Sequence, residues 1–396
     1  MTRIADRSDV ALTWTVQEQE QGFTARLRLR PLAHSGTPLE AQVHWQLGGA
    51  PPVLDGAILL VLHWCLRHAH RLHVEGTVSP TFIENLVDLQ EHWSHARPGE
   101  LHPFALSAET AVLPPRVETP HMLAAFSGGV DSTHTALRHS PMHGSLPGRR
   151  VSHLVFVHGA DIPYNESPLF DRAVARIAPI ATYVGCQIAT VRSDIRHAVP
   201  QDWEMSHGAQ LAGLMHLLSG VSDTALIPSS YTFSRFPFPW GSSPILDHFH
   251  SGSMLRARHD AGAYSRFDKI RDIARHPAVL PYLRVCWQGA DLSKNCGRCR
   301  KCINTRLMLL ACGASDEAFG EPIDNTLVRR VGPLPPEALA SLQQAHAYAM
   351  THDTRLTVAQ RRALLQRIHA VKRQNLRATV VGRARLVWHR LRNRNA

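Results

Sequence analysis

The chain has 396 residues, of which 44% are apolar, so it is long enough for two or three domains and a large core. Its longest apolar runs, such as residues 57–62, are too short to span a bilayer, and residues 1–7 lack the apolar stretch of a signal peptide. We therefore expect a cytoplasmic protein without a transmembrane segment. The formal net charge of +11 is concentrated in residues 355–396, which contain twelve Arg or Lys and no Asp or Glu.

Residues 1–118 are predicted to form a small α+β domain. Apolar and polar residues alternate in the period-two pattern of antiparallel strands, and helices are expected near 55–68 and from Pro80, where Ser79 supplies a cap. The strand patterns cover residues 10–16, 23–32, 41–45 and 73–74. Pro114, Pro115 and Pro120 indicate a linker, and we place the first domain boundary near residue 118.

From residue 119 the pattern changes to alternating strands and helices, which predicts a parallel sheet with helices on both faces. We expect strands at residues 122–126, 154–157, 187–191 and 225–228, and helices near 132–139, 170–184 and 204–218. Two further boundaries divide the rest of the chain into an α/β domain at 119–283, a cysteine-containing segment and helix at 284–330, and a helical basic extension at 331–396.

A glycine loop, Ser127-Gly128-Gly129-Val130-Asp131-Ser132, lies between the first of these strands and its helix. Two glycines let the backbone turn sharply and approach phosphates, while exposed amides and the helix N-terminus bind anionic oxygens. Asp131 repels phosphate, so its expected role is to hold a bridging Mg²⁺. The spacing fits neither a Walker loop nor a dinucleotide fingerprint. The alternative to a phosphate-binding loop is an ordinary glycine turn capped by serine.

This hexapeptide resembles the SGGxDS motif of the PP-loop ATP pyrophosphatase superfamily at each defined position. The resemblance implies a Rossmann-like sheet of the PP-loop/HUP type and cleavage of ATP between its α- and β-phosphates. Pyrophosphate would then lie on residues 127–132 and adenine near Val157 and His158. Enzymes with this motif include ligases that adenylate a substrate oxygen for attack by a nitrogen nucleophile, and tRNA-modifying enzymes.

Four of the seven cysteines, Cys286, Cys296, Cys299 and Cys302, lie within 17 residues of one another. Four thiolates suit tetrahedral Zn²⁺ and leave no open coordination position, which indicates a structural site. Lys294, Arg298, Arg300 and Lys301 would offset its negative charge. Buried free thiols and an iron–sulfur cluster are the alternatives.

The Cys-Gly-x-Cys-x-x-Cys run at 296–302, preceded by Cys286, resembles the zinc site of 7-cyano-7-deazaguanine synthase, a PP-loop enzyme. Residues 267–270 also resemble its lysine-containing segment, which implies that Lys269 contacts ATP or pyrophosphate; the alternative is a solvated helix residue. The resemblance covers about residues 121–313, and residues 1–118 and the basic tail have no counterpart in it.

Other candidate ligands follow predicted strands, because ligands of parallel sheets bind at the carboxyl ends of the strands. Asp161 could position substrate or be a turn residue before Pro163. Ser229 and Ser230 could contact substrate after the fourth strand. His248 lies in a long segment, 233–264, that could form a lid or simply pack on the core.

Three functions are consistent with these features: a ligase-like adenylating enzyme, a PP-loop tRNA-modifying enzyme, and a non-catalytic adenine-nucleotide-binding module. The basic tail favours an acidic partner such as RNA or a membrane surface, although it also fits a helix packed on its own protein. A small molecule or a peptide is the expected substrate, and a homodimer is possible. Cys65 and Cys186, which do not pair obviously, are a weak argument against tRNA thiolation.

Overall fold

The computed structural model describes residues 7–32, 37–110, 121–144, 146, 148, 150–329 and 334–392. Contacts divide the chain into two compact units, Met1–Ala263 and Tyr264–Ala396. The linker expected at residues 114–120 lies outside the described residues. No helix in the described ranges combines the length and apolarity needed to cross a membrane.

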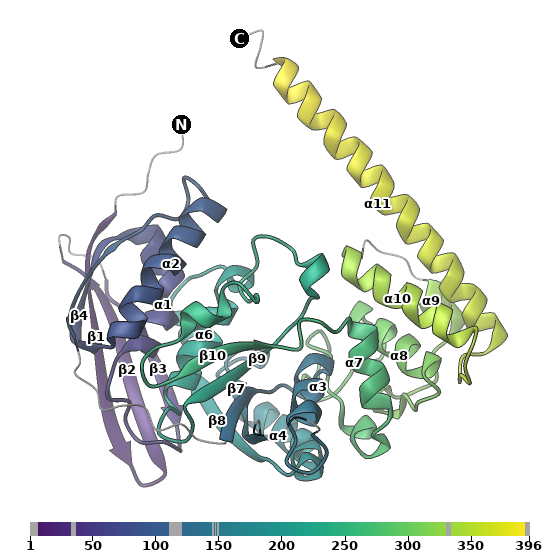
Figure 1. Ribbon diagram of the computed structural model, residues 1–396, viewed down its shortest axis with the longest axis horizontal. Coiled ribbons are helices and arrows are strands. Elements are labelled where there is room, and N and C mark those ends of the chain that lie inside the picture. The colour runs from purple at the N-terminus through teal and green to yellow at the C-terminus, as the bar shows by residue number, and fades with distance from the viewer. Residues whose placement is uncertain are drawn as a thin grey trace. The chain divides into compact units, whose positions relative to one another are not determined.

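The first unit is built on one mixed, mostly parallel sheet of ten strands in the order β10-β9-β6-β7-β8-β3-β2-β1-β4-β5 (Figure 1). The strands are β1 (Ser8–Gln19), β2 (Gly22–Pro31), β3 (Leu39–Trp45), β4 (Ala69–Val78), β5 (Ala105–Thr110), β6 (His121–Ala125), β7 (Arg150–His158), β8 (Gln187–Ser193), β9 (Thr224–Pro228) and β10 (Arg256–Asp260). This arrangement confirms the prediction of an α/β fold with a Rossmann-like parallel sheet.

The five parallel strands β8-β7-β6-β9-β10 form the Rossmann-like half of the sheet. The chain runs outward from β6 through β7 to β8 and then returns to β9 on the other side of β6. The strand order therefore reverses between β6 and β9, and such a reversal opens the crevice in which doubly wound sheets bind ligands. The glycine loop follows β6 and Ser229 follows β9, so both lie at this switch point.

The strands of the N-terminal 110 residues extend the same sheet. β3 pairs antiparallel with β8 through the register Val43↔Ser193, His44↔Arg192 and Trp45↔Val191. The side chain of Asp194 accepts a hydrogen bond from the amide of Gln42 at 2.6 Å, and this bond reinforces the junction. The predicted small sheet thus exists, but it is continuous with the Rossmann-like half.

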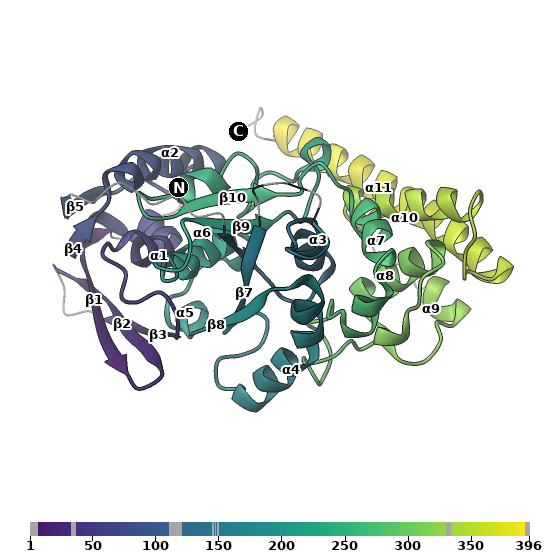
Figure 2. The same cartoon turned by 60° about the horizontal axis from the view of Figure 1, so that its bottom comes forward.

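Helices cover both faces of this sheet (Figure 2). The helices α3 (Val130–Arg138) and α4 (Ser167–Val184) lie on one face, while α6 (Trp203–His216) and α1 (Asp55–His68) pack together on the other. The remaining helical elements of this unit are α2 (Pro80–Ala96), α5 (Ile195–Ala198), η1 (Phe233–Arg235) and η2 (Asp247–His250). Gly213 and Gly56 allow α6 and α1 to approach closely, because a Cβ on either glycine would lie under 3 Å from the other's carbonyl oxygen.

The second unit is helical. Its elements are α7 (Arg266–Ala274), η3 (Pro277–Tyr282), α8 (Arg300–Ala311), η4 (Glu317–Phe319), α9 (Asn325–Arg329), α10 (Pro336–Ala349) and α11 (Val358–Arg392). The first turns of α11 bury Ala363, Leu364, Ile368 and Val371, a spacing typical of one helix face. Arg367 is also buried and donates to Asn304 Oδ1 at 2.7 Å. The basic extension is therefore anchored at its start by packing.

Candidate functional site

The glycine loop has the geometry that the sequence predicts for an anion-binding turn. β6 ends at Ala125, α3 begins at Val130, and Gly128 has a φ of +73°, a left-handed conformation that favours glycine. Gly129 is the N-cap of α3, and no side chain caps this helix. Within the described ranges, the amides of Gly128 and Val130 have no hydrogen-bond partner. The first turn of α3 can therefore accept an anionic oxygen.

Two serines close the loop on itself. Ser132 Oγ accepts a hydrogen bond from the Ser127 amide at 3.2 Å and donates to the Gly129 carbonyl at 3.2 Å. Ser127 Oγ lies 3.4 Å from Ser132 Oγ. Asp131 is in the first turn of α3 and is partly exposed. The residues predicted to bind phosphate and magnesium thus come together in one short bend.

A buried carboxylate, Asp260 at the end of β10, fixes α3 on the sheet. Its oxygens accept hydrogen bonds from Thr135 Oγ1 at 2.8 Å and from Arg138 Nη1 at 3.1 Å, and His139 Nε2 lies 2.8 Å away. Burial alone would raise the pKa of Asp260, but these partners, with His139 the strongest, lower it to about 2. Its carbonyl also accepts from the Ser229 amide at 2.9 Å, so Asp260 links the loop helix to the end of β9.

The predicted adenine neighbours lie at the end of β7. His158 is buried, its Nε2 lies 2.8 Å from the Pro163 carbonyl, and its ring stacks on Phe170 at 4.4 Å. Its side chain therefore supports the turn after β7. The next residue, Gly159, has a φ of +104°, and a Cβ there would lie 1.8 Å from the Ser193 carbonyl oxygen, so only glycine fits between β7 and β8.

The three candidate substrate contacts after β7 and β9 differ in accessibility. Asp161 and Ser230 are exposed, whereas Ser229 is fully buried. Ser230 therefore remains available to a ligand at the switch point, and Ser229 serves as a backbone link to β10 through its amide.

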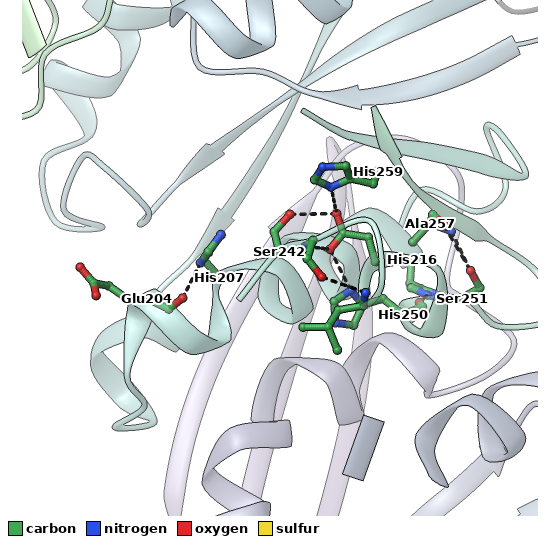
Figure 3. Close-up of polar contacts among 11 residues, drawn as sticks. Glu204, His207, His216, Ser242, His250, Ser251, Ala257 and His259 are labelled. Carbon is green, nitrogen blue, oxygen red and sulfur yellow. Dashed lines mark hydrogen bonds and ion pairs between the residues drawn. The ribbon is translucent and has the colours of Figure 1, made fainter. Parts of the chain in front are cut away.

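A second polar cluster includes His259 of β10 (Figure 3). His259 precedes Asp260 in this strand, so the two side chains point to opposite faces of the sheet. The buried carboxylate of Asp247 accepts from Ser242 Oγ at 2.8 Å and lies 2.8 Å from His259 Nδ1 and 3.9 Å from His250 Nδ1. His216 Nε2 contacts the His250 carbonyl at 2.9 Å. Burial lowers the pKa of His250 to about 4, so this ring is neutral near pH 7. The segment for which a lid and packing on the core were the alternatives is thus held to α6 and β10 by a buried network.

The four predicted metal ligands converge in the second unit. Their sulfurs all lie within 4.8 Å of one another, with Sγ–Sγ distances of 3.7 Å for Cys286–Cys299, 3.5 Å for Cys299–Cys302 and 3.9 Å for Cys296–Cys302. Sulfurs arranged tetrahedrally at ~2.3 Å from zinc would be about 3.8 Å apart, whereas a disulfide needs about 2.05 Å. The cluster could therefore hold a metal ion such as zinc.

Neighbouring groups orient these cysteines. The side chain of Asn295 accepts from the amides of Val285 and Cys286 at 2.8 and 3.2 Å, and donates to the Leu283 carbonyl at 2.8 Å. Gly297 has a φ of +71°, and a Cβ there would lie 2.5 Å from a backbone oxygen of Phe319. The two chain segments that supply the sulfurs are thus tied together by contacts within the protein.

A buried arginine supports the same turn. Arg306, 2% exposed, donates from Nε to Asp316 at 2.7 Å and from Nη1 to the Gly297 carbonyl at 3.3 Å. Neither Asn295 nor Arg306 was singled out from the sequence, although the position of Asn295 next to Cys296 is a signal that could have drawn attention to it.

Lys269, the predicted ATP contact, lies on α7 in the second unit and is only 1% exposed. Ser265 and Asp268 form a capping box at the start of this helix. The alternative of a solvated helix residue therefore does not hold. A buried lysine needs a specific environment, which is compatible with a functional role but does not define one.

The cysteines outside the cluster have no activated thiol. Cys65 is fully buried, and burial raises its pKa; burial also raises the pKa of Cys186 to about 12 and that of Cys312 to about 12. Reactive cysteines have lowered pKa values and accessible sulfurs. These three residues therefore lack the environment that lowers the pKa of a reactive cysteine.

The fold and these groups define an α/β protein with a Rossmann-like sheet, a glycine-rich bend at its switch point and a four-cysteine cluster. No family model matches the chain, and neither a curated protein nor a solved structure matches it.

Proposed function

We propose that the chain is an ATP-dependent, AMP-forming ligase-like enzyme of the PP-loop class. The observation that carries this proposal is the glycine bend at residues 127–132, whose left-handed Gly128 and uncapped helix start lie at the switch point of a Rossmann-like sheet. Phosphate-binding bends in such sheets occupy this position. The residue match to SGGxDS adds the expectation that ATP is cut between its α- and β-phosphates.

In this reaction a substrate oxygen attacks the α-phosphorus, the bond to the bridging oxygen breaks, and pyrophosphate leaves. A nitrogen nucleophile then attacks the activated carbon and AMP departs with the oxygen. The amides of Gly128 and Val130 would hold the pyrophosphate oxygens and stabilise the charge that develops on them. Asp131 would hold Mg²⁺, which supplies additional positive charge to the phosphates. Lys269 is proposed as a further phosphate contact.

The four cysteines are proposed to hold a structural Zn²⁺. Their mutual distances fit a tetrahedral thiolate site, and four protein ligands leave no position for a substrate. The zinc would stabilise the turns between Cys286 and α8 and would take no part in the chemistry.

The test is a pyrophosphate-release assay with ATP, Mg²⁺ and a panel of carboxylates, amines and peptides. Asp131→Ala should lower turnover at least about 100-fold, a typical cost of losing a group that stabilises transition-state charge. Asp171→Ala, an exposed carboxylate on α4, is the matched control and should retain full activity. Full turnover by Asp131→Ala would exclude the proposed magnesium site, and absence of nucleotide binding by the wild-type chain would exclude the proposal as a whole.

A further inference from the structure

A cleft of about 630 Å³ lies in the first unit, apart from the glycine bend. It is formed by the second half of α1, the turn that follows α2, and residues 196–205, which run from α5 into the first turn of α6. Its volume is within the range of small-molecule pockets. We call it the arginine cleft because Arg67, Arg97 and Arg196 line it.

The wall of the cleft is held in place by side-chain contacts. Gln201 donates from Nε2 to the Leu60 carbonyl at 2.8 Å and accepts from the amides of His63 and Trp64 at 3.1 and 3.2 Å. This side chain enters the hydrogen-bond ladder of α1 and fixes residues 196–205 against that helix. Hydrogen bonds therefore fix the two walls of the cleft to each other.

The charges in the cleft do not cancel. Both Arg67 and Arg97 pair with the single carboxylate of Glu100, Arg97 through Nε at 2.8 Å. The other carboxylate in the lining, Asp202, caps α6 by accepting from the Glu204 amide at 3.0 Å. Three guanidinium groups and two carboxylates leave one net positive charge in the lining. Burial lowers the pKa of His63, another lining residue, to about 3, so this histidine adds no charge near pH 7.

Arg196 is the guanidinium without a carboxylate partner among the described residues. It lies 4.4 Å over the ring of Trp203 and donates to the carbonyl of Ala160. These two contacts fix its orientation, and its remaining N–H groups suit the two oxygens of a carboxylate. Arg196 also lines a small recess with Val157 and Ser193, at the ends of β7 and β8.

This position places Arg196 at the same carboxyl edge of the sheet as the glycine bend. β8 is two strands from β6, and two strand spacings amount to about 10 Å. A small substrate could therefore have one end near the α-phosphate of ATP and an anionic end at Arg196.

We propose that the arginine cleft binds a carboxylate of the small-molecule substrate, with Arg196 as the residue that recognises it. The inference rests on the proposed function for its role in the reaction, although binding itself can be tested without ATP. One net positive charge matches a single carboxylate group better than a phosphate monoester, whose two negative charges would both lie in the cleft. The second carboxylate of a dicarboxylate such as succinate can remain in the solvent.

The experiment is a thermal-unfolding and calorimetric titration of the full zinc-loaded chain with succinate at constant ionic strength. Succinamide serves as the neutral analogue and inorganic phosphate as the competing anion. Succinate should bind saturably and raise the melting temperature by roughly 2–3 °C at tenfold excess over its dissociation constant. Succinamide should produce no shift, and phosphate should bind more weakly than succinate.

Arg196→Gln should abolish this response, and Arg196→Lys should weaken succinate at least about tenfold, because an ammonium cannot form the two-pronged contact. The Lys variant keeps the charge if the Gln variant fails to fold. Arg172→Gln, an exposed arginine on α4, is the matched control and should bind as the wild type does. Phenylglyoxal labelling of Arg196, read by peptide mass spectrometry, should be suppressed by succinate.

Three results would overturn the inference: no saturable response to succinate, an undiminished response in Arg196→Gln, or tighter binding of phosphate than of succinate. Failure of the proposed function is separable from these. Succinate binding should be unchanged in Asp131→Ala. If the wild-type chain binds succinate but not MgATP, the inference about the cleft stands and the proposed ATP-dependent reaction fails.

Discussion

The carboxylate of Asp260 provides a direct test of how α3 is held on the sheet. Replacing it in Asp260→Asn removes the charge while keeping the shape. The partners Thr135, Arg138 and His139 lower the pKa of Asp260 from an ordinary value of 3.8 to about 2. At about 1.36 kcal/mol per pKa unit, the ionised carboxylate contributes about 2 kcal/mol to stability near pH 7. No large discount for solvent applies, because the side chain is 7% exposed.

The pH dependence has a defined sign. Because the folded pKa lies below the unfolded one, this contribution is complete above pH 4–5 and is lost as the pH falls through about 2. Urea denaturation at pH 7 should show Asp260→Asn to be less stable than wild type by about 2 kcal/mol, and its melting temperature should fall by roughly 2–4 °C. About half of the difference should remain at pH 3.

Asp171→Asn is the control, because this carboxylate on α4 is exposed. It should unfold within about 0.5 kcal/mol of wild type, as surface substitutions usually do. A destabilisation by Asp260→Asn of no more than that size, or a difference that is the same at pH 7 and pH 3, would refute the reasoning.

Further predictions concern the metal site and the buried histidines. Cys299→Ser should lose about one zinc per chain by elemental analysis, while Cys312→Ser, outside the cluster, should keep it; equal zinc in both would exclude the four-thiolate site. Asn295→Ala should weaken zinc about 10–100-fold in chelator competition, because it orients the ligand segments, and unchanged affinity would contradict that role. Burial lowers the pKa of His63 to about 3 and that of His250 to about 4. The free energy of unfolding should therefore fall by about 1.4 kcal/mol per pH unit for each histidine as the pH falls from about 6.5 toward 4. A urea-denaturation profile that is flat over this range would show that the two rings are not buried in the neutral form.

The parts of the fold that depend on local pattern could be predicted from the sequence. The helix expected at 55–68 occurs at those residues as α1, and the strands expected at 122–126, 154–157, 187–191 and 225–228 correspond to β6, β7, β8 and β9. Apolar runs bounded by turn residues define such elements without long-range information. The cysteine cluster could be predicted in the same way, because the spacing of its four cysteines along the sequence indicates a metal site.

Features that depend on distant pairing could not be predicted. β10 lies in a segment of weak periodicity, because a short strand whose two faces carry Asp260 and His259 has no apolar alternation to detect. The joining of β3 to β8 pairs residues about 150 positions apart, which no local pattern encodes. Arg196 was missed for the same reason: its partners Trp203 and Ala160 become neighbours only in the folded chain.

The pairing of β3 with β8 has a consequence for any attempt to divide this chain. A fragment beginning at His121 would leave the backbone groups of β8 unpaired along one side and would uncover the apolar surface of α6 that α1 normally occupies. Open strand edges of this kind recruit other chains, so such a fragment should aggregate instead of folding alone. The Rossmann-like half and the N-terminal half of the sheet should accordingly melt in one transition, and the N-terminal strands cannot serve as a hinged cover.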